Sequence, residues 1–570
     1  MTKSTYNPKH TQELGKLIKY VARFLKAAND KSQWPSLYPA LLVLSERLSN
    51  LNEQQGSLFQ WLLSCEVMQF DYATRLHLKR VGALAVICKS QGYRQSDCQL
   101  MMMALLACDL SITNLLKKRA QGLALEGKEK ERYQRAPLLS LKMLNVGSQQ
   151  QPALTQILAK SLPYQRIISH HKNAQLHDGY ARTVALAKLL GNYCTTTSHK
   201  PGLHFFKACA LVFKTTHHLD VYNACIKVVD YLSPQLLGSC ASFDDNNFIY
   251  MGRHPDNEHI FLDTQGDKPR YRLIEQPVWN YEPNCVEYGS FDTWFSRIDA
   301  PVKRLEMHHS EPTKNYTQLM HDLSFADSYE QIEECIASDH DLVAMIMKKA
   351  ASYNRTENHA STLRHALSMV GLYNVGDFIT RVIFEHQISR LQHPLAHFIS
   401  ARITSTVNVI SELSQNMPNV QVQQLAALYL GYFNFFLTQS RHHFSRTLAL
   451  DPLKLAFDEH NPRPMSALLG ISNYDDHALH AYLSEHLGTK NQWVDALLHS
   501  EQLPFNELDA QGRLCLAIKL VVFHLYGPNH PISPWQNQVV EKAMTEHQGP
   551  HQELAVLVQL ALSCAPANGI

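Results

Sequence analysis

The stretch 11–25, TQELGKLIKYVARFL, has the apolar spacing of one face of an α-helix. Its apolar residues recur at intervals of three or four, the pattern of a helix that packs against a core. These residues are Leu14, Leu17, Ile18, Val21 and Leu25. Windows with the same spacing continue from about Thr11 to Leu237, so the sequence predicts a large helical module there.

Helical periodicity stops between Ser239 and about Arg304. Short runs rich in β-branched and aromatic residues are separated there by Asp, Asn, Pro and Gly, which favour turns. The runs are Phe248–Met251, His259–Leu262 and Tyr271–Ile274. They predict a small antiparallel sheet, followed by an irregular connection over Tyr281–Asp299.

The helical pattern returns near Asn315 and continues to the last residues. Ser328 and Gln331 have the spacing of a capping box, in which a serine side chain accepts from the backbone three residues later. Asp339 is predicted to cap the helix that follows. The predicted fold class is mainly α, with two helical modules and a small antiparallel β element between them.

The predicted domain map has four parts. Residues 1–60 are expected to form an N-terminal helical extension, and 61–304 a first helical module with a β-rich C-terminal part. Residues 305–530 are expected to form a second helical module, and 531–570 a C-terminal helical tail.

Charge and composition narrow the classes of function. The 570 residues include 53 Lys and Arg against 51 Asp and Glu, a formal net charge of +2, which argues against nucleic acid as the main partner. Hydrophobic residues make up 45% of the chain, enough for sizeable cores. No uninterrupted apolar run reaches the 18 residues typical of a membrane span. We therefore expect a cytoplasmic protein without membrane insertion.

The twelve cysteines are scattered along the chain. The closest of them, Cys88, Cys98 and Cys108, are ten residues apart, and no C-x-x-C pair occurs. This spacing predicts neither a zinc ribbon nor a disulfide framework, and we expect mostly buried thiols.

Residues 116–136, LKKRAQGLALEGKEKERYQRA, carry seven basic and three acidic side chains. One interpretation is a solvated loop and helix face, and the other is a docking patch for an anionic ligand. The sequence leaves both open.

Four stretches of the second helical module resemble, in the same order, motifs of the HDOD family. Ile336–Ser352 resembles the opening signature of that family, and Ser361–Gly371 resembles its next helix and turn. Ala427–Leu437 and Trp493–His499 resemble two later motifs, so the resemblance spans about residues 316–510. It implies a helical signalling or interaction domain that lacks hydrolytic residues.

A metal-binding His-Asp pair could stand within one of these motifs. This chain has Leu430 and Gly431 there, and neither side chain can ligate a metal. His499 is expected to be a structural or exposed histidine rather than a ligand.

The first helical module resembles the HD-GYP phosphodiesterases, which hydrolyse cyclic di-GMP at a cluster of two or three metal ions. HLKRV at 77–81 resembles the H-x-x-R-V helix of that family, and ALLACDLSI at 104–112 resembles its AALLHDIGK element. ISHHK at 168–172 resembles its HHE motif, and Gly179–Ala181 resembles the GYP that names the family.

This second resemblance implies a vestigial metal site of eight positions. Four of them keep side chains that can ligate a metal, namely His77, Asp109, His170 and His171. The other four replace implied ligands, namely Cys108, Ala136, Lys172 and Asn192. Two-metal hydrolysis needs dense carboxylate and imidazole ligation, and the Lys172 ammonium would oppose cations. We expect no catalytic residue, no bound metal and no cofactor.

The expected function is bacterial signal transduction without catalysis, through contact with protein partners of a signalling pathway; a homo-oligomer fits this role as well. One alternative is a sensor that binds cyclic di-GMP without cleaving it. Its ligand-binding residues would be His170, His171, Tyr180, Lys117, Lys118 and Arg119. The other alternative is a residual one-metal phosphodiesterase. Its ligands would be His77, Asp109, His170 and His171.

Overall fold

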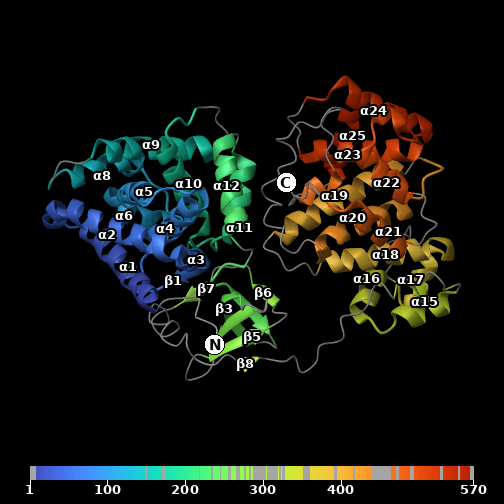
Figure 1. Cartoon of the computed structure of the whole chain (residues 1–570), viewed down its shortest axis with the longest axis horizontal. Helices are drawn as coiled ribbons and strands as arrows, with labels where there is room; N and C mark the ends of the chain where they lie inside the picture. The colour runs from blue at the N-terminus through green and yellow to red at the C-terminus, as the bar shows by residue number, and fades with distance from the viewer. Residues whose placement is uncertain are drawn as a thin grey trace. The chain divides into compact units, whose positions relative to one another are not determined.

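The computed structural model describes most, but not all, of the chain. The described residues are 8–147, 151–169, 175–216, 218–232, 235–243, 246–253, 259–264, 270–274, 278–280, 284–286, 303–304, 319, 322–323, 326, 328–350, 360–389, 395–414, 417–439, 464–469, 474–487, 493–526, 531–549 and 553–564. Contacts between Cα atoms divide the chain into two compact units, Met1–His308 and His309–Ile570 (Figure 1).

The first unit is a helical core with a small sheet. Its longer helices are α1 (Pro8–Ala27), α2 (Trp34–Gln55), α3 (Phe59–Ser64), α4 (Tyr72–Gln91), α5 (Gln95–Ala107), α6 (Thr113–Ala120), α7 (Gly127–Gln134), α8 (Ala136–Leu144), α9 (Pro152–Ser169), α10 (Gly179–Cys194), α11 (Phe205–Thr215) and α12 (Leu219–Tyr231). Helices α1 and α2 pack on α4 and α5, so the predicted N-terminal extension contributes to the core of this unit.

Helix α4 is the centre of the first unit. It packs against α3, α5, α10 and α12, and its residues from Ala73 to Cys88 are buried apart from Arg75. Asp71 caps its first turn, because the Asp71 Oδ1 atom accepts from the backbone N–H of Thr74 at 2.9 Å. Gly92 ends it at φ 69°, a left-handed conformation that glycine adopts without a steric penalty.

The β-rich part of the first unit forms two sheets. The strands are β1 (Cys65–Val67), β2 (Cys240–Phe243), β3 (Asn246–Arg253), β4 (His259–Asp263), β5 (Arg270–Ile274), β6 (Val278–Asn280), β7 (Asn284–Val286) and β8 (Lys303–Arg304). The larger sheet has the order β6-β2-β3-β4-β5-β8 and is antiparallel except for the β5–β8 pair. The predicted strands within 248–274 are confirmed as β3, β4 and β5.

The β5–β8 pair is parallel in a sheet predicted to be antiparallel, and two short strands form where the sequence predicted none. Cys65–Val67 lies inside the predicted helical module but forms β1, and Asn284–Val286 lies inside the predicted irregular connection but forms β7. The two strands pair in parallel, with Cys65 opposite Asn284. Local periodicity missed both because each is three residues long and pairs with a partner more than 200 positions away.

All regular secondary structure in the described residues of the second unit is helical. Its elements include α15 (Tyr329–Ile336), α16 (His340–Ala350), α17 (Leu363–Val370), α18 (Leu372–Ser389), α19 (Ala396–Ser414), α20 (Val422–Gln439), α21 (Asp476–Leu487), α22 (Trp493–Gln502), α23 (Ala510–Tyr526), α24 (Pro534–Glu546) and α25 (Leu554–Cys564). Both predicted caps are confirmed: Ser328 accepts from Gln331 N–H at 3.3 Å, and Asp339 accepts from Leu342 N–H at 3.0 Å. The fold class, mainly α with a small β element, is confirmed.

Among the described residues, one stretch is apolar and long enough to cross a membrane by length and composition alone. It is Gln95–Ala120, and 78% of its apolar window is buried inside the structure. The stretch contains α5 and α6, and burial of this degree is typical of core helices.

Candidate functional site

A cluster of buried charged side chains in the first unit is centred on Asp109, just after α5. The Arg80 Nη1 atom on α4 lies 2.5 Å from Asp109 Oδ2, and the Lys188 Nζ atom on α10 lies 3.2 Å from Asp109 Oδ1. All three side chains are at least nine-tenths buried. Each carboxylate oxygen of Asp109 therefore has its own cationic partner.

Asn192 completes this cluster from the far end of α10. Its Oδ1 atom accepts from Arg80 Nε at 3.1 Å and from Arg80 Nη2 at 2.8 Å. All three guanidinium nitrogens of Arg80 are thus engaged, and the hydrogen bonds join α4, α10 and the end of α5. Such a network holds each side chain in one orientation.

Gly191 allows α10 to lie close enough to α4 for these contacts. A Cβ atom on Gly191 would stand 2.5 Å from Arg80 Cγ and 2.8 Å from the Arg80 backbone nitrogen. These separations are shorter than any normal contact, so a larger residue would push the helices apart.

Electrostatics keeps the cluster charged despite its burial. Burial is the largest effect on Asp109 and opposes its ionisation, but the charges of Lys188 and Arg80 outweigh it and hold the pKa of Asp109 well below its usual value. For Lys188 and Arg80, burial again acts most strongly and favours the neutral form. The Asp109 charge overcomes it, so the pKa of each cation is raised.

His77 lies one turn before Arg80 on α4 and is fully buried. Its Nδ1 atom is 2.7 Å from the carbonyl oxygen of Ala73, whereas its Nε2 atom has no hydrogen-bond partner among the described residues. Burial and, next, the charge of Arg80 lower the pKa of His77 to about 4. The imidazole is therefore neutral at pH 7, and its Nδ1–H donates to Ala73.

Two further predicted site residues, Cys108 and Ala136, are buried and serve the packing. Cys108 directs its thiol to the carbonyl of Leu105 at 3.1 Å, and burial raises the pKa of that thiol. Ala136 begins α8, and its carbonyl accepts from Ser111 Oγ at 3.0 Å. His170, His171 and Lys172 lie outside the described residues.

The basic residues of α6 do not gather at one point. Lys118 pairs with Glu129 of α7 at 2.7 Å, and Arg119 donates to Tyr133 Oη and stacks on its ring. Lys117 instead lines an open groove between the start of α4, the end of α6 and the loop after α10. These pairings support the solvated-face interpretation for Lys118 and Arg119.

Tyr180 lies elsewhere in the first unit. Its hydroxyl donates to Asp97 Oδ1 at 2.9 Å, in the first turn of α5, whereas α6 follows the other end of that helix. The structure thus brings His77, Asp109 and Asn192 into one region but places Tyr180 apart from the α6 cations.

The described residues at this site do not fit a metal ion. Both oxygens of Asp109 already bind cationic side chains, and a metal would compete with two fixed positive charges. Within the described ranges, no group of three or more His, Cys, Asp or Glu side chains could hold a metal.

Sequence reasoning assigned no role to the two cations that bind Asp109. Arg80 belongs to the quoted HLKRV run, and Lys188 is a lone charge in the apolar run TVALAKLLG. A lysine in the buried stripe of a helix needs a counter-charge, and this signal could have identified Lys188.

The chain has no match among models of known protein families, among curated proteins or among solved structures.

Proposed function

We propose that this chain is a non-catalytic bacterial regulatory protein that acts in signal transduction through contacts with other proteins. The observation that carries the proposal is the binding of Asp109 by Arg80 and Lys188. In the resemblance to the HD-GYP family, Asp109 is the retained metal-binding carboxylate, and here two buried cations occupy its oxygens.

The chemistry of these cations supports the proposal. A metal ion in a hydrolase accepts lone pairs, binds water and lowers the pKa of that water toward 7. Guanidinium and ammonium groups supply positive charge but accept no lone pair. The Asp109 cluster is therefore suited to joining α4, α5 and α10 rather than to activating water.

The second unit offers a parallel argument. Gly431 of α20 stands where the resemblance to the HDOD family would allow a ligating aspartate. A Cβ atom there would lie 3.2 Å from side-chain atoms of Leu483 and Phe384, both buried. Apolar side chains surround this position, which fits an interaction domain without a metal site.

The test is an assay of the full-length chain for bound metal and for hydrolysis of cyclic di-GMP, with Mn²⁺ or Mg²⁺ supplied. We expect less than one metal ion per chain and no product, with protein partners recovered by cross-linking in bacterial cells. Turnover that is lost in Asp109→Asn and kept in Asp220→Asn, an exposed aspartate paired with Arg182, would overturn the proposal.

A binding titration of the same full-length chain with cyclic di-GMP tests the sensor alternative. Saturable binding of cyclic di-GMP without product and without added metal would replace the protein-contact proposal by the ligand-sensor function. If cyclic di-GMP does not bind, the sensor alternative is wrong, and cross-linking then tests the proposed contact with proteins.

A further inference from the structure

An open groove lies on the first unit, where three segments meet. They are the segment 68–75 at the start of α4, the end of α6 and the loop 196–198 after α10. Its volume is about 510 Å³, within the range of roughly 300–1,000 Å³ found for small-molecule sites. None of the groove-lining residues belongs to the Asp109 cluster.

The walls of the groove are held together by hydrogen bonds. The backbone N–H and the hydroxyl of Ser198 both donate to the carbonyl of Ala120, at 3.1 and 2.7 Å. The backbone N–H of Thr196 donates to both carboxylate oxygens of Glu66 at 3.2 Å. Because the loop is tied to α6 and to β1, little ordering is needed when a ligand enters.

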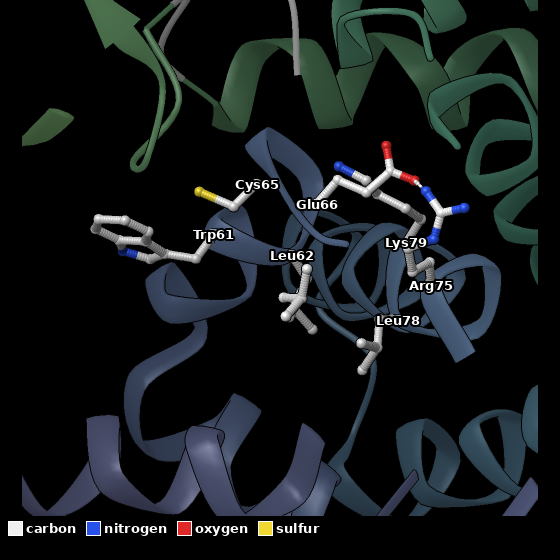
Figure 2. A pocket seen from close by; sticks show the side chains of 8 residues that line it. Trp61, Leu62, Cys65, Glu66, Arg75, Leu78 and Lys79 are labelled. Carbon is white, nitrogen blue, oxygen red and sulfur yellow. Dashed lines mark hydrogen bonds and ion pairs between the residues drawn. The ribbon is translucent and has the colours of Figure 1, made fainter. Parts of the chain in front are cut away.

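Arg75 is one of the residues that line the groove. Its Nη1 atom lies 2.5 Å from Glu66 Oε1, and the Glu66 side chain is fully buried. Figure 2 shows the Arg75 guanidinium directed at the Glu66 carboxylate, beside a second space of about 10 Å³ that both residues line. The ion pair fixes the guanidinium in place.

Arg75 keeps donors that the fold does not use. Its Nε atom is buried and has no hydrogen-bond partner among the described residues, and its Nη2 atom has none there either. A guanidinium presents five N–H groups in a planar fork, which matches the oxygens of a phosphate or a carboxylate. The Nη2 atom, unlike Nε, is not buried, so a ligand in the groove can accept from it without displacing the wall.

Lys117 supplies a second cation at the rim of the groove. It is exposed, and its ammonium has no ion pair or hydrogen bond with any described residue. The neighbouring α6 cations, Lys118 and Arg119, are engaged with α7, whereas Lys117 lines the groove.

The groove also has an apolar side. Met68, Phe70 and Tyr72 line it, and the Met68 side chain is 47% exposed. An inorganic anion alone would leave these apolar side chains in contact with water. An aromatic or apolar group on the ligand would cover them and gain hydrophobic stabilisation.

We propose that this groove binds a small organic oxyanion. Its phosphate or carboxylate oxygens accept from Arg75 and Lys117, and its aromatic or apolar part lies against Met68 and Tyr72. This inference does not rest on the proposed function, because no groove-lining residue takes part in the Asp109 cluster.

The test is a ligand-observed NMR titration of the full-length chain with phenyl phosphate, benzoate and benzyl alcohol. We expect saturable binding of phenyl phosphate or benzoate and none of benzyl alcohol, which keeps the ring and lacks the charge. The tighter of the two anions identifies the oxyanion. Absence of saturable binding by both anions would overturn the proposal.

Two variants locate the binding. Lys117→Gln removes an exposed charge. We expect the affinity for the anion to fall roughly tenfold, because one charge-assisted hydrogen bond is lost. Lys142→Gln, an exposed lysine on α8 outside the groove, makes the same charge change and is expected to bind as the parent chain does.

Arg75 is tested by Arg75→Lys, which keeps a positive charge for the buried Glu66 but removes the guanidinium fork. We expect weakened anion binding with an unchanged circular dichroism spectrum. If Lys117→Gln and Arg75→Lys both bind with the affinity of the parent chain, the anion binds elsewhere and the proposal is wrong.

Discussion

The guanidinium of Arg80 and the carboxylate of Asp109 form a buried ion pair, with 2.5 Å between Nη1 and Oδ2. The pair joins the centre of α4 to the residue that follows the C-terminal turn of α5. Lys188 binds the other carboxylate oxygen from α10, so three elements of the first unit depend on one aspartate.

Replacement of Asp109 by Asn is expected to destabilise the first unit by about 3–5 kcal/mol, because Arg80 and Lys188 would stay buried without a counter-charge. Urea unfolding with hydrogen exchange of peptides from α4 and α10 measures the loss.

The matched control for Asp109 is Asp220→Asn, which breaks an Arg–Asp pair whose aspartate side chain is 64% exposed. We expect a change of about 1 kcal/mol or less for this control. Equal effects of the two substitutions would contradict the account of a buried, stabilising cluster.

His77 is expected to make the stability of the first unit depend on pH. The unfolded chain takes up a proton on this residue near pH 6.5, and the folded chain only near pH 4. Between these values the unfolded state binds more protons, so the free energy of unfolding falls as the pH is lowered from 6.5 to 4. The fall is about 3 kcal/mol.

Unfolding titrations at several pH values check this expectation. His77→Asn keeps a donor for the Ala73 carbonyl and is expected to lose that part of the pH dependence. His499→Asn, at an exposed position on α22, is expected to keep it. A parent-like slope in His77→Asn would show that another group is responsible.

Gly191→Ala is expected to destabilise the first unit by about 1–3 kcal/mol, because its Cβ would meet Arg80 at 2.5 Å and force α4 and α10 apart. Gly376→Ala is the control on α18, where a Cβ would meet no atom of the described residues within 4 Å. Because alanine favours a helix more than glycine does, we expect this exposed substitution to raise the free energy of unfolding by up to about 1 kcal/mol. Thermal unfolding of both variants gives opposite signs if the close approach is as described.

The second unit has its own buried pair, Glu501 and Lys519, with 3.3 Å between Oε1 and Nζ. Glu501 also accepts from the backbone N–H of Met465 at 2.9 Å. Glu501→Leu leaves Lys519 without its carboxylate and is expected to cost about 3 kcal/mol. The double variant Glu501→Leu with Lys519→Met is expected to recover part of this loss, as measured by hydrogen exchange of α22 and α23. A double variant less stable than the single one would contradict the expectation.

Much of the secondary structure could be predicted from the sequence because the signals are local. The apolar spacing of 11–25 predicted a helix in the region where α1 forms, and the β-rich runs predicted β3, β4 and β5. Ser328 and Asp339 were predicted as caps and accept the expected backbone N–H groups. Each of these features depends on residues within a few positions of one another, so a single sequence displays it.

The candidate site was only partly accessible in this way. Asp109 and Asn192 were singled out through a family resemblance, and their identification as vestigial metal-binding positions stays a prediction. The partners that determine what Asp109 does were not assigned. Arg80 and Lys188 are 29 and 79 positions from it, and periodicity predicts only that a helix face is buried.

The sequence by itself determined the fold class, a mainly helical chain with a β-rich segment. Hydrophobic periodicity depends only on residues that are close together in the chain. The tertiary structure alone decided which charges meet. The absence of a side chain at Gly191 brings α10 against α4, and this approach lets Lys188 and Asn192 reach Asp109 and Arg80. Burial then makes these pairings decisive, since a charge removed from water needs a partner close to it.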